Sequence, residues 1–168
     1  MTMRKVATAV GITPMALYRH FRNRDGLLNA VADAGFVELA ASFAELRLTG
    51  RIDRQLLKIL DVFLDRAFDN PRLFELMFLT KREGARQYPE DFRMRRSPTA
   101  NVSADVIIRA MQTGYFRKDD VWEIVFETGA LMQGLVMLYL GGRMAMSSPE
   151  FRAFCHRSFG RYLNGIRA

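Results

Sequence analysis

The fold is decided by residues 3–28, which read MRKVATAVGITPMALYRHFRNRDGLL. Apolar residues recur with helical spacing in the first part of this stretch, and the inward face is expected to hold Met3, Val6, Ala7 and Val10. Gly11 follows directly and is predicted to end this helix in a left-handed backbone conformation. The pattern therefore predicts a short helix that stops at a tight turn.

A second helix is predicted after the turn, because Thr13 can cap it and Pro14 suits its first position. Ile12 is expected to plug the turn, and Leu17 and Phe21 are expected to point inward. The outward face is expected to hold Met15, Ala16, Tyr18, Arg19 and His20. This is the layout of a helix-turn-helix, whose second helix enters the major groove of DNA.

The same stretch resembles the tetracycline-repressor-like (TetR/AcrR) family of bacterial regulators. The resemblance is carried by Val6-Ala7, Gly11-Ile12, Leu17-Tyr18, His20-Phe21 and the run Asn23-Arg24-Asp25-Gly26-Leu27-Leu28. A generic helix-turn-helix would match only the Ala, Gly and apolar positions. The resemblance implies that the residues facing DNA are Thr13, Met15, Ala16, Tyr18, Arg19, His20 and Arg24.

The chemistry of these side chains suits DNA. Arg19 has a guanidinium fork that can reach guanine O6 and N7. Arg24 and the N–H groups after Asn23 can hold a phosphate at a helix N-terminus, and Arg4 and Lys5 are further candidates for phosphate contact. For each residue, an ordinary place on the surface is the competing interpretation.

The resemblance implies one more helix ahead of this stretch, whereas the present sequence begins at Met1, inside the turn that precedes Arg4. Without such a helix the inward face of the first two helices would lack a cover. Two interpretations stay open. Either the sequence starts late, or the protein is a ligand-binding helical dimer that does not bind DNA.

The positive net charge of the chain favours an anionic partner. The formal net charge is +7, and residues 1–24 contain five basic side chains and no acidic one. A single cysteine, Cys155, excludes a disulfide framework within the chain and suits a reducing cytoplasm. The longest apolar run, residues 129–142, is too short to cross a bilayer and is predicted to be a buried helix, so no membrane partner is expected.

The rest of the chain predicts an all-α body. A third helix starts after the Asn23 cap and continues to residue 46, and later helices are predicted over residues 52–69, 72–80, 98–113, 120–140 and 149–166. Asp119 is expected to cap the helix that starts at residue 120, which should be buried on all sides. Residues 81–97 are predicted to be a solvated loop. The expected division is a head with its connecting helix, 1–46, and a ligand-binding and dimerisation domain, 47–168.

The body is rich in Phe and Met, with 13 and 10 of them in the chain. The family resemblance implies a pocket for a small, largely apolar effector, and such residues line adaptable pockets well. Plain core packing is the competing interpretation for each one. The candidates are Phe63, Phe74, Met77, Phe78, Met111, Phe126 and Met132, with Glu127 and Gln133 as polar anchors.

The last two helices carry more apolar surface than one small bundle can use. Paired across a two-fold axis they would form a four-helix interface, as in the family, and Gly129, Gly134 and Gly141 would allow close approach. A homodimer also suits a palindromic operator. The family resemblance thus implies a ligand-responsive repressor that binds double-stranded DNA.

An enzyme is not expected. The only histidines are His20 and His156, and the adjacent Cys155 and His156 would point apart on a helix. No Glu-x-x-His motif accompanies Glu123 and Glu127, and no Gly-rich phosphate-binding motif occurs. The sequence implies no catalytic residues, no metal site and no cofactor.

Overall fold

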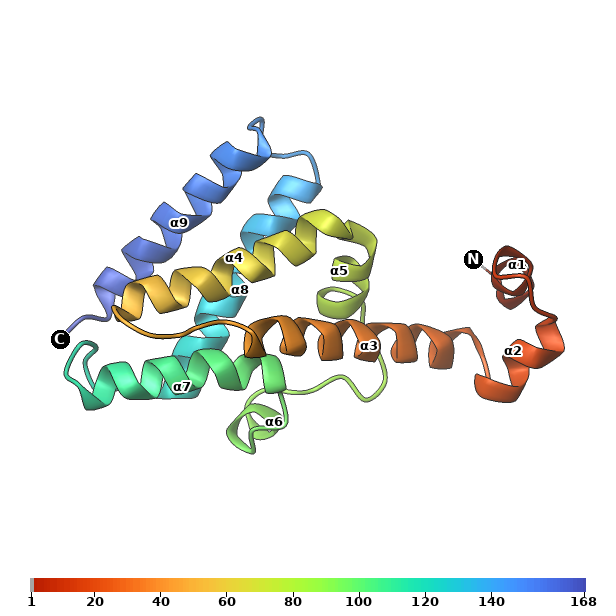
Figure 1. Ribbon diagram of the computed structural model, residues 1–168, viewed down its shortest axis with the longest axis horizontal. Coiled ribbons are helices and arrows are strands. Elements are labelled where there is room, and N and C mark those ends of the chain that lie inside the picture. Colours follow the sequence, from red (N-terminus) through yellow and green to blue (C-terminus); the bar gives the residue numbers. More distant parts are fainter. Residues whose placement is uncertain (1) are drawn as a thin grey trace.

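The computed structural model describes residues 2–168, and this part of the chain forms nine α-helices and no β-strand. Two short helices, α1 (Met3–Ala9) and α2 (Pro14–His20), form a head that stands away from the body, and α3 (Arg24–Ala44) joins the two parts (Figure 1). The body contains α4 (Ile52–Asp69), α5 (Pro71–Phe78), α6 (Glu90–Arg93), α7 (Pro98–Gln112), α8 (Val121–Leu140) and α9 (Ser148–Gly165). The predicted all-α class with a helix-turn-helix is confirmed.

The head forms as its local signals predict. Gly11 has a φ of 73°, which ends α1 in the left-handed region. The hydroxyl oxygen of Thr13 accepts a hydrogen bond from Ala16 N at 3.1 Å and caps α2. The side-chain oxygen of Asn23 accepts one from Gly26 N at 2.8 Å and caps α3. These three residues set the turn and the starts of both helices that follow it.

Several boundaries in the body differ from the prediction. Asp120, not Asp119, caps α8, because its Oδ1 accepts hydrogen bonds from the N–H groups of Trp122 and Glu123. Ser147 caps α9 through a capping box, in which its N–H and hydroxyl groups both donate to Glu150. The segment predicted as a loop contains the short helix α6.

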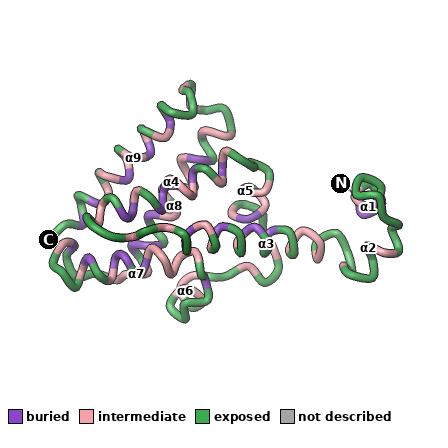
Figure 2. The backbone as a smooth tube through the Cα atoms, viewed as in Figure 1, coloured by how far each residue is buried: buried purple, intermediate pink, exposed green. Residues whose placement is uncertain are grey.

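The body has one core, to which α3, α4, α5, α7, α8 and α9 all contribute (Figure 2). The head has a separate small cluster in which Met3, Ala7 and Leu17 are buried. Val10, predicted to point inward, caps the end of α1 outside this cluster and is 61% exposed. Ile12 does not plug the turn and is also exposed.

Helix α8 is not buried on all sides, contrary to the prediction. Its exposed apolar residues include Phe126, Met137 and Leu138. Both α3 and α8 are long and apolar enough, by length and composition, to cross a bilayer. In the fold both helices pack within the body, α3 against α5 and α7, and α8 against α7 and α9.

Candidate DNA interface and ligand cavity

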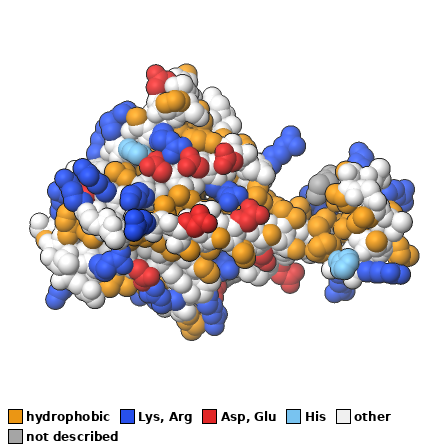
Figure 3. Space-filling view, in the orientation of Figure 1, with side chains coloured by type: hydrophobic (Ala, Val, Ile, Leu, Met, Phe, Trp, Pro, Cys, Tyr) orange, Lys and Arg blue, Asp and Glu red, His pale blue; other side chains and the backbone are white. Residues whose placement is uncertain are grey.

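The outward face of α2 presents polar and apolar side chains to solvent. Tyr18, Arg19 and His20 are exposed, and so are Thr13 and Met15, whereas Ala16 is half-buried. Figure 3 shows Lys and Arg side chains around the head. The predicted DNA-facing residues of α2 therefore share one accessible, basic surface.

Two further predicted contacts lie at helix starts. Arg4 and Lys5 are exposed in the first turn of α1, where the hydroxyl oxygen of Thr2 accepts from Lys5 N. Arg24 begins α3, with its guanidinium group 3.6 Å from the Asp25 carboxylate and about half of its side chain exposed. Both positions combine N–H groups at a helix N-terminus with a cationic side chain, which suits a phosphate.

A cavity of about 520 Å³ lies in the body. Its wall includes residues of α3, α4, α5, α7, α8 and α9 and of the segment 80–97. The volume falls within the roughly 300–1,000 Å³ that is typical of small-molecule sites. The sequence-predicted ligand residues that line it are Phe63, Met77, Phe78, Phe126, Met132 and Gln133.

Three predicted ligand residues lie outside the cavity. Phe74 is fully buried behind its wall, with ring centroids 5.2 Å from Phe63 and 4.7 Å from Phe78. Met111 packs against the core near the end of α7. Glu127 accepts a hydrogen bond from Tyr162 Oη at 2.5 Å, and burial together with this bond raises the pKa of Tyr162. Helical periodicity placed these residues near the middle of the body but could not say which side of a wall they occupy.

The charged residues of the cavity wall were missed by the sequence analysis. They are Asp33 of α3 together with Arg82 and Arg86 of the segment 80–97. Arg82 Nη1 lies 3.5 Å from Asp33 Oδ1, and Arg86 Nε donates to the carbonyl oxygen of Arg96 at 2.6 Å. Both guanidinium groups lie beside the Phe36 ring, at 5.9 and 5.6 Å from its centroid. No local pattern marks them, because the segment mixes charges without a period.

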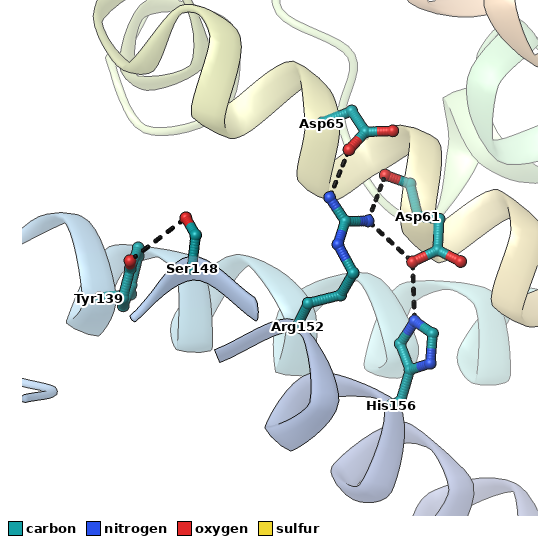
Figure 4. Close-up of polar contacts among 6 residues, drawn as sticks. All are labelled: Asp61, Asp65, Tyr139, Ser148, Arg152 and His156. Atoms are coloured by element: carbon teal, nitrogen blue, oxygen red, sulfur yellow. Dashed lines mark hydrogen bonds and ion pairs between the residues drawn. The ribbon is translucent and has the colours of Figure 1, made fainter. Parts of the chain in front are cut away.

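A polar cluster joins α9 to α4 (Figure 4). Asp61 Oδ1 accepts a hydrogen bond from Arg152 Nη1 at 2.8 Å and lies 2.7 Å from His156 Nε2. Arg152 also pairs with Asp65 one turn further along α4. The cluster fixes α9 against a helix that contributes to the cavity wall.

Cys155 and His156 do not act together. The Cys155 side chain is fully buried, and burial raises the pKa of its thiol to about 11. The His156 ring is directed at Asp61 instead. Neither arrangement activates a nucleophile.

Family models match both parts of the chain. Residues 56–162 match the model described as "Tetracyclin repressor-like, C-terminal domain", and residues 1–31 match "Bacterial regulatory proteins, tetR family". No match was found among curated protein sequences.

Solved structures share the fold at low sequence identity. A Rhodococcus protein of unknown function has a TM-score of 0.76 at 20% identity, covering 100% of this chain and 86% of its own. The fatty acid degradation regulator FadR from Bacillus halodurans has a TM-score of 0.76 at 13% identity, with 99% and 89% covered. PfmR, a TetR family transcriptional regulator from Thermus thermophilus, has a TM-score of 0.70 at 15% identity, with 100% and 87% covered.

Proposed function

Because the chain belongs to the tetR family of bacterial regulatory proteins and is a transcriptional regulator, we propose that it is a ligand-responsive repressor. It binds a palindromic operator in the cytoplasm as a homodimer and is released by a small, largely apolar effector. Operator and effector each lower the affinity for the other by the same factor.

The position of α3 is the observation that carries this proposal. Its N-terminal end bears the head, and further along it Asp33, Phe36 and Leu39 line the cavity. A ligand that changes the packing of these side chains acts directly on the helix that orients the DNA-reading surface. This geometry supports coupling between the two sites without an intermediate element.

A stripe on α8 supports the homodimer. It contains Phe126, Ala130, Gly134 and Leu138, which recur every four residues, together with Met137, three residues after Gly134. All but the half-buried Gly134 are exposed. A Cβ atom at Gly134 would meet nothing within 4 Å in the protomer. An apolar stripe with a small residue at its centre suits the close approach of a second copy.

The test is binding of the protein to a labelled fragment of its own upstream DNA at about 50 and about 200 mM salt. Arg19→Ala is expected to weaken binding by about tenfold or more, because a bidentate arginine contact to guanine is lost. Lys118→Ala removes one positive charge from the exposed loop before α8 and serves as the control.

Equal effects of Arg19→Ala and Lys118→Ala would indicate only non-specific attraction to positive charge. No binding by a folded dimer would favour the second candidate function, a ligand-binding dimer without DNA binding. The observation that bears on that second candidate is the exposure of Val10 and the partial burial of Val6 and Phe21 in the head.

A further inference from the structure

The least satisfied charged group in the cavity wall is Arg82. Its side chain is only 6% exposed, and its Nε has no hydrogen-bond partner among residues 2–168. A guanidinium group keeps its proton in a protein, so this side chain stays charged where it is buried. A buried charge is costly unless an opposite charge and hydrogen bonds compensate it.

The protein supplies little of that compensation. Asp33 is the carboxylate nearest to Arg82, but the two groups are 3.5 Å apart and the Asp33 side chain is 67% exposed. A pair of this kind is well screened by water. Arg86 adds a second guanidinium group to the same part of the wall, and within residues 2–168 only its Nε makes a hydrogen bond, to the Arg96 carbonyl oxygen. This end of the cavity therefore has an excess of positive charge and of unused donors.

The rest of the wall is mainly apolar. The uncharged polar residues of the wall are Thr80, Ser97, Thr99, Ser103, Thr128 and Gln133. The hydroxyl group of Thr128 is already occupied, because it donates to the Ile124 carbonyl oxygen at 2.7 Å. The apolar part includes Leu60, Phe63, Ile107, Val125, Met132 and Leu163.

We infer that the cavity takes an amphipathic anion, with an apolar chain along the helical walls and a carboxylate or phosphate group held by Arg82 and Arg86. The inference rests on the proposed effector site and adds the head group of the effector. A carboxylate or phosphate accepts from a guanidinium fork through two parallel hydrogen bonds. The apolar chain fills space lined by Leu, Phe, Val and Met side chains.

The experiment compares four probes with the same ten-carbon chain: decanoate, decyl phosphate, 1-decanol and decyltrimethylammonium. Each displaces the neutral dye N-phenyl-1-naphthylamine from the full-length protein, below its micellar concentration. At least one anion is expected to bind about tenfold or more tightly than decanol, as charge-assisted hydrogen bonds predict. The cation is expected to bind most weakly. The tighter of the two anions identifies the head group.

Two variants locate the effect. Arg82→Met is expected to remove the preference for the anions while leaving the affinity for decanol unchanged. Arg66→Met is the matched control, because Arg66 also pairs with a carboxylate of α3, Glu38, but does not line the cavity. If Arg82→Met fails to fold, the comparison of the four head groups on the unmodified protein still tests the inference.

Decanol binding as tightly as both anions would overturn the inference but leave the effector site in place. The same holds if Arg82→Met affects all four probes equally. Failure of the dye and of every probe to bind would overturn the effector site as well.

Discussion

A Cβ atom on Gly35 of α3 would stand 2.5 Å from the sulfur atom of Met77 on α5. Gly35 and Met77 are both buried, and Met77 lines the cavity. The helix that carries the head thus packs against the cavity wall at a point where a larger residue than glycine would require the Met77 side chain to shift.

We expect Gly35→Ala to lower the free energy of unfolding by about 1 kcal/mol, although alanine is the better helix former. Overpacking against Met77 costs about 1–3 kcal/mol, and the gain in helix propensity offsets about 1 kcal/mol of it. Urea unfolding measures the change. Gly134→Ala, where the added Cβ meets nothing within 4 Å, should be neutral or stabilising. If the two variants change the free energy of unfolding equally, the close contact between position 35 and Met77 does not affect stability.

We expect Asp61→Ala to lower the free energy of unfolding by about 1–3 kcal/mol, because His156 loses its acceptor and Arg152 keeps only the Asp65 carboxylate. Asp69→Ala, at an exposed position near the end of the same helix, should change it by less than about 0.5 kcal/mol. A double-mutant cycle with Arg152→Met should give a coupling energy of about 0.5–3 kcal/mol. Strict additivity would mean that the cluster does not hold α9 on α4.

Gly134→Gln is expected to fold normally and to raise the dimer dissociation constant by about tenfold or more, since a long side chain at the centre of the α8 stripe blocks close approach. Sedimentation measures the dissociation constant, and Gly134→Ala is the smaller matched change. A dimer that tolerates Gly134→Gln would have its interface elsewhere.

Cys155 is expected to react slowly with a thiol reagent at pH 8, because a pKa of about 11 leaves its thiol almost fully protonated. The folded-state pKa lies above the ordinary value of 9.0, so the corresponding stability is present below pH 9.0 and is lost as pH rises towards about 11. Thiol reactivity and urea unfolding across this range check both statements. Fast labelling of the folded protein at pH 8 would contradict them.

Local signals predicted the head well. Gly11, Thr13 and Asn23 act on their nearest neighbours, so their effect can be read from a few residues of sequence. Val10 shows the limit of periodicity, which gives the direction of a side chain but not whether another part of the protein covers it. Sequence patterns also missed two starts by one residue, because Asp120 and not Asp119 caps α8, and α9 starts at Ser148 and not at residue 149.

Long-range relations were not accessible from the sequence. Asp61 and Arg152 are 91 residues apart, and no local pattern marks either as the other's partner. Arg82 belongs to a segment of mixed charge that resembles ordinary surface, yet its side chain is buried because the segment runs alongside the cavity. The apolar surface of α8 was correctly noticed, but composition does not distinguish a core side from an open one.

Because α3 is packed in the body at Gly35, a small rotation of this helix would be amplified at its N-terminal end. Its 21 residues span about 30 Å, and Gly35 lies about 16 Å along the axis from Arg24, at a rise of about 1.5 Å per residue. If α3 rotated by about 10° about Gly35, Arg24 would move sideways by about 3 Å. Under the proposed function, a ligand in the cavity that rotated α3 by this amount would displace the head by a few ångströms relative to the DNA.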